Sequence, residues 1–292
     1  MDIFVMQLLN TLLYASILFL IAGGLSLIYG VMRIVNLAHG TLYAIGAYVA
    51  AWLVGKGAAA GLPPWILLAL LPLGAVAVGL VGAVLEPTLL RPLYQRAEEY
   101  QLLVTFGLLL ILEDGIRFIW GGTPMSATVI MEVLGSIRLF GARYPIYNLV
   151  IIGVGGVAAV LLWAFVYRTK FGVLLRATAQ DMRMASALGV NVKKVYVQAF
   201  ALGCMMAGLG GAIIVPGQAA VLGMGTDALI LAFVVVVIGG LGSLQGALIG
   251  ALIVGGVRTV GIMFFPEIEL AVLYLIATVV LLVRPTGLFG TS

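Results

Sequence analysis

Side chains that could carry out chemistry are few in this chain. Its 292 residues include one histidine, one cysteine and 11 acidic residues, so an H-E-x-x-H zinc motif cannot form and soft metal ligands are scarce. The sequence has no G-x-S-x-G motif, and Gly55-Lys56-Gly57 lacks the spacing and the hydroxyl of a phosphate-binding loop. The cysteine, Cys204, lies in an apolar run and is expected to be a small buried thiol. We therefore expect no catalytic residue, no metal and no cofactor; if ATP drives this protein, the ATPase is another chain.

Asn36 and the single histidine, His39, are a polar pair in apolar surroundings. They fall near the start of an apolar segment at about 35–54. Polar groups in hydrocarbon are costly unless they face protein or a water-filled path. Two interpretations stay open: a histidine that hydrogen-bonds between helices, or a group that lines a gate or a translocation path.

The longest polar interruption is Arg168 to Lys194, called here the basic stretch. It holds six of the 15 Lys and Arg residues of the chain and a single acid, Asp181. Within it, residues 174–189 have the pattern of one short amphipathic helix that Gly189 would stop. Three polar side chains spaced i, i+4 and i+7 share a face of that helix: Arg176, Gln180 and Arg183.

Such a helix could rest on lipid headgroups or fit a groove on a partner protein. Bulky apolar residues would suit insertion into lipid, whereas small residues suit close contact with protein. The small residues are Ala179, Ala185, Ser186 and Ala187. Their presence favours a protein partner.

A further polar cluster, Glu113, Asp114 and Arg117, lies near the end of an apolar segment at about 101–120. Its i, i+3 and i+4 spacing allows a local ion pair. The alternative is a contact for a partner that arrives from outside the cell. Asp227 is open to the same interpretation, or it caps a helix.

The elements that must position these residues are membrane-spanning helices. The chain is 63% hydrophobic and 9% charged, against about 25% charged in soluble domains. Charge-free runs of about 20 residues recur, which is enough to cross a bilayer core, and they lack the alternation of a membrane β-barrel. We expect an all-α polytopic membrane protein, one transmembrane domain over residues 1–292, with eight or nine transmembrane helices and possible broken or half helices. The segments expected are about 7–31, 35–54, 64–85, 101–120, 145–167, 195–215, 227–239, 243–262 and 269–283.

The distribution of positive charge predicts the orientation. With the basic stretch on the cytoplasmic side and alternating spans, ten Lys and Arg residues fall inside and five outside. The N-terminus is then outside, the C-terminus inside, and Trp52, Trp65 and Trp120 lie near the outer interface. The segment 227–239 is short for a span; if it is a half-helix that turns back, the C-terminal side flips. The net charge of +4 follows from this asymmetry, so we expect contact with the lipid bilayer and not with nucleic acid.

The 39 glycines of the chain are patterned. One stripe expected on the segment 243–262 consists of Gly242, Gly246 and Gly250. A second, on the segment 195–215, consists of Gly203, Ala207 and Gly211. Such stripes allow backbones to approach closely, either for packing alone or along a substrate path.

Residues 34–47 also resemble residues 238–251. The positions matched in register are Ile34, Leu37, Ile45, Gly46 and Ala47. Five matches among small and aliphatic residues are compatible with chance, and equally with the internal repeats from which transporters are often built.

Three stretches resemble the permease subunits of ABC importers for branched-chain amino acids. GLSLIYGVMRIVNLAHGTLYAIGAYVA (24–50) is similar to their N-terminal signature, in which an (I/V)N-hydrophobe-AHG run follows a YG pair. GGLGSLQGALIGA (239–251) looks like their C-terminal glycine motif, and RATAQDMRMASALGVNVKKV (176–195) like the cytoplasmic loop that docks on the ATPase. One departure is that Asp181 stands four residues before Ala185 and not beside it, which leaves individual docking roles open.

This resemblance implies a permease subunit of the cell inner membrane that translocates branched-chain amino acids. It implies a second permease of similar fold, two cytoplasmic ATPase subunits and a periplasmic substrate-binding protein, with residues 168–194 as the coupling loop. The ATPase-coupling residues would be Arg176, Gln180, Asp181, Arg183 and Gly189. As substrate-path residues we expect Asn36, His39, Tyr43, Ser243 and Gln245.

Other classes stay open. The importer could carry urea or short amides. A stand-alone carrier or channel would need membrane-embedded acids or a proton relay, of which the sequence has almost none. A membrane-embedded enzyme would need a nucleophile and base or a metal set. Only the importer predicts uptake that depends on a separate ATPase.

Overall fold

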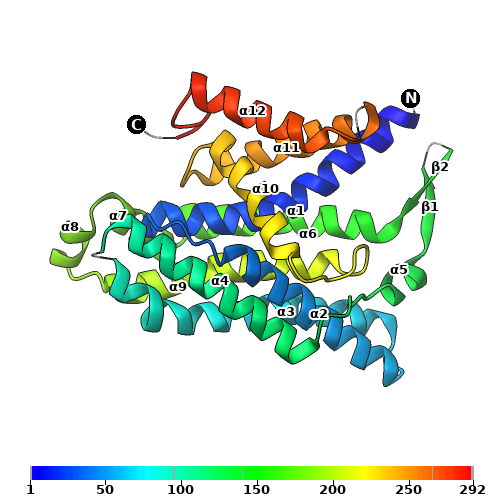
Figure 1. The fold of residues 1–292 in the computed structure, drawn as a ribbon, viewed down its shortest axis with the longest axis horizontal. Coiled ribbons are helices and arrows are strands. Elements are labelled where there is room, and N and C mark those ends of the chain that lie inside the picture. Colours follow the sequence, from blue (N-terminus) through cyan, green and yellow to red (C-terminus); the bar gives the residue numbers. More distant parts are fainter. Residues whose placement is uncertain (1, 95, 140, 265, 291–292) are drawn as a thin grey trace.

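The structure is a computed structural model that describes residues 2–94, 96–139, 141–264 and 266–290. The described chain is a bundle of helices with one short antiparallel β-hairpin (Figure 1). The elements are α1 (Asp2–Met32), α2 (His39–Ala59), α3 (Pro64–Leu85), a π-helical turn η1 (Glu86–Leu90), a 3-10 turn η2 (Arg91–Leu93), α4 (Glu98–Trp120), α5 (Val129–Leu134), β1 (Ser136–Leu139), β2 (Ala142–Pro145), α6 (Ile146–Arg168), α7 (Lys170–Gln180), α8 (Met182–Ala187), α9 (Val192–Ile214), α10 (Met224–Gly239), α11 (Leu244–Phe264) and α12 (Glu269–Val283).

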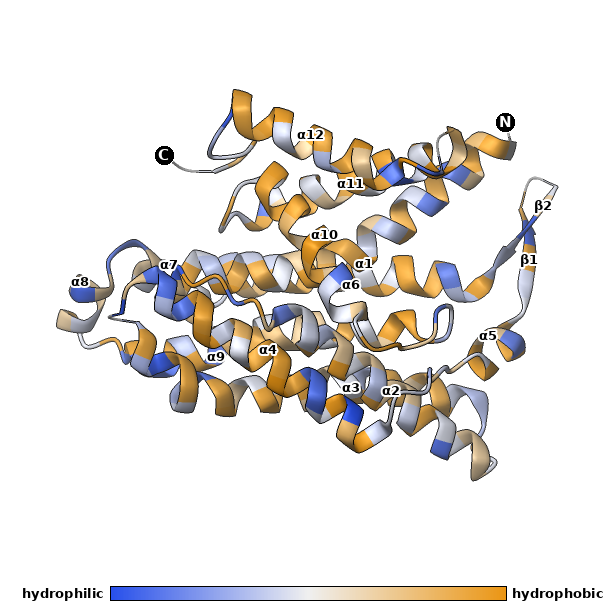
Figure 2. Cartoon of the chain, viewed as in Figure 1, coloured by the Kyte–Doolittle hydropathy of each residue, from blue (hydrophilic) through white to orange (hydrophobic). Residues whose placement is uncertain are grey.

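The prediction of an all-α, multi-pass membrane protein is confirmed. Among the described residues, six helices are long and apolar enough to cross a membrane, and α10 and α12 are shorter apolar helices. Hydrophobic residues cover the middle of the bundle, and polar residues gather toward its ends (Figure 2). Two predicted segments, 64–85 and 269–283, coincide with α3 and α12. The largest difference is at 35–54, where the helix begins at His39 and continues to Ala59.

The two ends of the bundle differ in character (Figure 1). One end, called here the basic end, carries α7, α8 and the C-terminus. The other, the hairpin end, carries the N-terminus, α5 and the β-hairpin. Successive long helices alternate in direction between these ends, which is the alternation that the sequence predicts. α10 ends at the basic end and α11 returns from there, so the segment 227–239 does not reverse the C-terminal side.

At the centre, α1 and α9 cross in antiparallel directions. A Cβ on Gly24 would lie 2.4 Å from the Gly203 carbonyl oxygen, and one on Gly203 would lie 2.8 Å from the Gly24 oxygen. Further along, Gly210 of α9 meets Leu20 of α1. Residues with no side chain therefore let the two backbones touch, as in other membrane bundles.

The contacts around this crossing are paired. α3 packs on α9, and α11 packs on α1 in the same way. α2 packs on α9, and its counterpart α10 packs on α1. α4 lies beside α2, and α12 lies beside α10. The contacts of α9–α12 thus repeat those of α1–α4, and because α1 and α9 are antiparallel, this is the contact pattern of an inverted repeat. The sequence match of 34–47 with 238–251 pairs α2 with α11, whereas the contacts pair α2 with α10. The paired contacts therefore do not support that register of the repeat.

Two helices begin inside the bundle. Beyond Met32 the chain turns at Arg33 (φ +53°) and returns in an irregular segment before α2 starts at His39. The His39 ring lies 3.0 Å from the Ile21 carbonyl, which is about 16 Å back along α1 from its end. α10 likewise starts at a left-handed glycine, Gly223 (φ +85°). The predicted broken helices therefore exist at the starts of α2 and α10.

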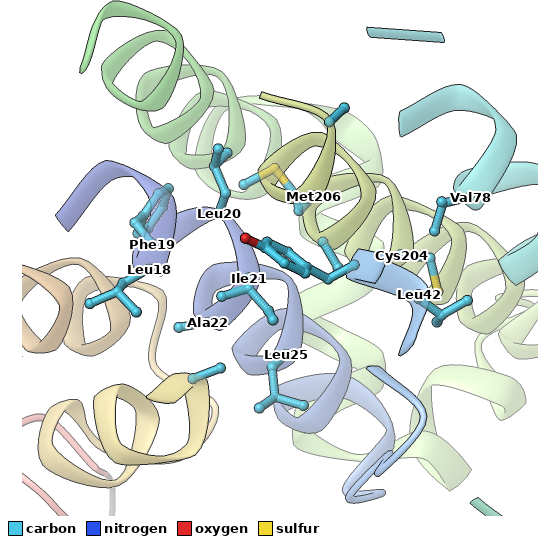
Figure 3. Close-up of a cluster of buried hydrophobic side chains, with 14 of the residues drawn as sticks. Leu18, Phe19, Leu20, Ile21, Ala22, Leu25, Leu42, Val78, Cys204 and Met206 are labelled. Carbon is cyan, nitrogen blue, oxygen red and sulfur yellow. The ribbon is translucent and has the colours of Figure 1, made fainter. Parts of the chain in front are cut away.

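The starts of these two helices meet. A Cβ on Gly40 would lie 2.0 Å from the Gly225 carbonyl oxygen, and one on Gly225 would lie 2.5 Å from the Gly40 oxygen. Around them, side chains of α1, α2, α3 and α9 form the apolar core (Figure 3). Cys204 is fully buried in this core, as predicted.

The structure confirms one of the two predicted glycine stripes and only part of the other. Gly203 and Gly211 pack on α1 and α2, so the stripe on α9 is confirmed. The stripe on α11 is only partly correct, since Gly242 (φ +80°) lies in the turn before the helix and packs on Gly30. Gly246 and Gly250 do lie on α11, where they face backbone oxygens of α10.

Candidate functional site

The basic stretch folds into two short helices and not one. Asp181 separates α7 from α8 with extended backbone (φ −148°, ψ 99°), and its carboxylate accepts a hydrogen bond of 2.9 Å from the Met184 N–H. The single helix predicted over 174–189 is therefore wrong, because the aspartate caps a new helix instead of continuing the old one. Gly189 (φ +85°) follows α8, so its predicted role as a stop is confirmed.

Because of this break, the three residues of the predicted polar face do not share one helix: Arg176 and Gln180 lie on α7, and Arg183 lies on α8. Arg176 turns inward: its guanidinium donates to the Val166 carbonyl oxygen at the end of α6 and stacks over Tyr167, 5.3 Å from the ring centre. A cation at a helix C-terminus is favourable, so Arg176 joins α7 to α6. Gln180 and Arg183 are exposed.

α8 projects from the basic end (Figure 1) and carries apolar side chains in the open. Met182, Met184 and Leu188 are 47%, 58% and 78% exposed, with Arg183 among them. We call these four residues the α8 surface. Flexible methionines and an exposed leucine on a projecting helix are typical of a protein-binding surface.

Beside the α8 surface lies a broad groove of about 1300 Å³. It runs between α7, α8 and the start of α9 on one side and the end of α1, η2 and the start of α4 on the other. Five cationic residues line it: Arg33, Arg91, Arg96, Arg183 and Lys193. Since Glu98 and Asp181 are the acids that also line it, the groove is positively charged.

A chain of side-chain contacts links α8 to the end of α3. The Tyr196 hydroxyl donates to the Met182 sulfur (3.3 Å), and the Tyr196 ring meets Tyr94 edge-on at 5.1 Å. Tyr94 in turn donates to Glu86 Oε1 at 2.5 Å, and Arg91 Nη2 lies 2.7 Å from Glu86 Oε2. Burial and the hydrogen bond to Glu86 raise the pKa of the Tyr94 hydroxyl well above its usual range. These contacts connect α8 to η1, the π-helical turn that follows α3, so a displacement of α8 would displace this turn as well.

Sequence reasoning missed this link. Glu86 is fully buried, and a carboxylate at the end of an apolar run, followed five residues later by Arg91, is a signal that could have found it. A buried charge needs a partner, and the chain supplies one nearby. Tyr94 carries no such signal, because its place is set by the turn η2.

Asn36 and His39 are both fully buried within the chain. The Asn36 Oδ1 atom accepts from the Ala38 N–H (3.1 Å), and His39 Nε2 hydrogen-bonds to the Ile21 carbonyl (3.0 Å). The first interpretation, a histidine that bonds one helix to another, is what the structure contains. Asn36 Nδ2 and His39 Nδ1 have no protein partner among the described residues, so a role in the path stays a prediction.

The other predicted path residues are Tyr43, Ser243 and Gln245. Tyr43 is buried with its ring against Gly210. Ser243, in the turn before α11, accepts a hydrogen bond from the Gly246 N–H (3.0 Å), and Gln245 is exposed in the first turn of α11. The structure thus brings Asn36, His39 and Tyr43 together near α1 and leaves Ser243 and Gln245 at the basic end.

The predicted ion pair at Glu113, Asp114 and Arg117 is not formed. Within the ranges that the structure describes, the ion pairs are Arg91–Glu86 and a long one of 3.8 Å between Arg258 and Glu269. Asp114 and Arg117 are exposed, whereas the Glu113 side chain is half-buried toward α2. Asp227 is in the first turn of α10 without a capping hydrogen bond.

These features define a class of protein. A bundle of apolar helices, an inverted repeat and two helices that begin inside the bundle are the architecture of membrane transporters. The projecting α8 surface and the positively charged groove beside it are where such a bundle can meet a soluble partner. The chain is a multi-pass membrane protein of the transport class.

The comparisons with known proteins give the family. The family model described as "Branched-chain amino acid transport system / permease component" matches residues 7–283. The chain belongs to this family.

Curated relatives cover nearly the whole chain. The high-affinity branched-chain amino acid transport system permease proteins LivH of Salmonella typhimurium and Escherichia coli K12 are 29% identical to it, over 98% of this chain and 96% of theirs. BraD of Pseudomonas aeruginosa is 28% identical over the same shares. No solved structure matches the chain.

Proposed function

We propose that this chain is the transmembrane permease subunit of an ABC importer that carries branched-chain amino acids across the inner membrane. The observation that carries the proposal is the family match over residues 7–283. Relatives whose names state branched-chain amino acid transport align with the chain almost from end to end. The substrate class is transferred from them.

The partners follow from what the chain contains and lacks. Its sequence has no phosphate-binding loop, so two separate ATPase subunits supply the energy. The excess of positive charge at the basic end supports a cytoplasmic position for it, where the α8 surface, Gln180, Asp181 and Gly189 would meet an ATPase. A second permease of similar fold completes the membrane part, and a periplasmic binding protein delivers substrate at the hairpin end.

The mechanism is alternating access. Closure of the ATPases on ATP displaces α8, and the contacts from Met182 through Tyr196 and Tyr94 carry that displacement to Glu86 at the end of α3. α3 packs on α9, and α9 packs on α1 and α2, so the displacement reaches the centre of the bundle. Rigid helices that rock against one another then expose the path to one side at a time.

The substrate path runs along the inward starts of the broken helices. There the backbones of α2 and α10 touch at Gly40 and Gly225. Asn36, His39 and Tyr43 are buried near these starts and remain path candidates. Ser243 and Gln245 belong to the exit at the basic end.

Co-purification tests the ATPase contact. The tagged chain is expressed with the genes of its importer, purified in mild detergent, and every bound subunit is identified by mass spectrometry. Arg183→Glu with Leu188→Ser is the α8-surface variant, and Arg143→Glu, exposed on β2 at the hairpin end, is the matched control. An ATPase that binds the wild type and the control but not the α8-surface variant supports the proposal. An ATPase that never binds, or that binds the α8-surface variant as well as the control, contradicts it.

A further inference from the structure

A small pocket lies between α2, α4 and the start of α10, on the hairpin-end side of the bundle. Its walls are Thr41, Ala44 and Tyr48 of α2, Glu113 and Ile116 of α4, and residues 221–223 and 225–226. Its volume is about 10 Å³, which is room for one group the size of a water molecule.

Tyr48 gives the first sign that the pocket takes a ligand. The residue is fully buried, its ring packs near Trp120 at 5.7 Å, and its hydroxyl has no hydrogen-bond partner among the residues described. A buried hydroxyl without a partner is costly. Because Tyr48 lines the pocket, a polar group held there would satisfy it.

Glu113 determines the charge of that group. Its half-buried carboxylate lines the same pocket and forms no ion pair within the described part of the chain. Three residues that carry hydroxyls also line it: Thr41, Tyr48 and Thr226. A carboxylate only accepts hydrogen bonds and a hydroxyl can accept them, so the pocket suits a compact cation with several donors and repels an anion.

A primary ammonium group meets these requirements. It is about as large as a water molecule, it is positively charged, and it has three N–H donors. We propose, building on the proposed function, that this pocket binds the α-ammonium group of the amino acid during translocation. Glu113 supplies the counter-charge and Tyr48 an accepting hydroxyl, while the rest of the substrate stays outside the pocket.

The position of the pocket suits a substrate on its way in. Trp120, the last residue of α4, packs on Tyr48 from the hairpin end. Thr41 and Gly225, on the opposite wall, belong to the place where the starts of α2 and α10 meet. A substrate delivered at the hairpin end therefore reaches Glu113 before it reaches the centre of the bundle.

Thermal unfolding of the purified full chain tests the pocket without requiring uptake. The probes are 3-methylbutylamine, which has the ammonium group, 4-methylpentanoate, which has the carboxylate alone, and sodium chloride against choline chloride. We expect 3-methylbutylamine to raise the unfolding temperature of the wild type and of Asp114→Asn, the exposed neighbour. Glu113→Gln and Tyr48→Phe should lose most or all of this shift, and 4-methylpentanoate should give none. No shift with the amine, an equal shift in Glu113→Gln, or the same shift with sodium alone would overturn the inference.

Uptake by the complete importer separates this inference from the proposed function. If the wild type imports leucine, Glu113→Gln should lower the maximal rate about tenfold or more, the effect of a lost charged hydrogen bond. Glu113→Asp should restore part of the rate, and co-purification of the ATPase should not change. A wild type that shows the amine shift but imports no leucine refutes the proposed function and leaves the ammonium pocket supported. Normal uptake by Glu113→Gln refutes the pocket alone.

Discussion

Gly211 is the residue at which α9 packs directly on the backbone of α2, and its replacement by alanine has a predictable cost. A Cβ there would lie 1.9 Å from the Tyr43 carbonyl oxygen and 3.0 Å from the Ala47 nitrogen. Real Cβ contacts are almost never closer than 3.0 Å. The neighbours are backbone atoms within a helix, so no side chain can rotate away and the two helices must separate.

Two opposing effects set the magnitude. Alanine gains about 0.5–1 kcal/mol over glycine in a helix interior. Overpacking a close-packed contact costs typically about 1–3 kcal/mol, and the upper part of that range applies because the clash is with backbone. We therefore expect Gly211→Ala to lower the free energy of unfolding by roughly 1–2 kcal/mol.

The assay is thermal unfolding in detergent, followed by the loss of the monodisperse protein on size-exclusion chromatography. Gly156→Ala is the matched control, since Gly156 lies in the interior of α6 with no atom within 4 Å of the added Cβ. That control should be unchanged or slightly stabilised. A Gly211→Ala protein that unfolds at or above the temperature of Gly156→Ala would refute the close contact of α2 with α9.

Three further outcomes follow from the contacts. Tyr94→Phe removes a hydrogen bond to the buried Glu86 carboxylate and should cost about 1.5–3 kcal/mol of stability in the same unfolding assay; an unchanged transition would contradict that bond. Asp181→Ala should destabilise α8 by about 0.5–2 kcal/mol and speed its amide hydrogen exchange, while Asp181→Asn keeps the cap; equal exchange in the two variants would argue against the break. Cys204 should resist a membrane-permeant maleimide until the protein unfolds; rapid labelling of the folded protein would show that the core is open.

The helices could be predicted from the sequence because lipid imposes a simple requirement: each span must be apolar and long enough to cross the bilayer. α3 and α12 coincide with their predicted ranges because prolines or charges bound them sharply in the sequence. The predicted start of α2 is wrong, because Ile34 and Leu37 are apolar like the helix that follows, which begins at His39. What fixes that start is the hydrogen bond of His39 to Ile21, which joins residues far apart in the sequence.

The basic stretch shows a different limit. Its residues keep helical spacing from Leu174 to Gly189, so periodicity alone predicts one helix. Asp181 ends this helix because its carboxylate caps a new helix, accepting a hydrogen bond from the Met184 N–H. This break turns Arg176 toward α6 and leaves Arg183 exposed, and periodicity cannot distinguish these two arginines.

The candidate sites were predicted unevenly. The family motifs pointed to Asn36 and His39, and the structure places both at an interrupted helix. The spacing of Glu113 to Arg117 predicts an ion pair, which the described residues do not form. The pocket beside Tyr48 depends on the meeting of α2, α4 and α10, which no local pattern reveals.

The most direct test of the account is uptake of radiolabelled leucine by proteoliposomes that contain this chain, its partner permease and the two ATPases. The binding protein and leucine are supplied outside the vesicles. ATP is enclosed in the vesicle lumen, which the basic end of the chain faces. We predict uptake that requires ATP, the ATPases and the binding protein together, and that falls with Arg183→Glu/Leu188→Ser. Uptake that continues without the ATPases, or that follows an ion gradient instead of ATP, would contradict the assignment of this chain as the permease subunit of an ABC importer.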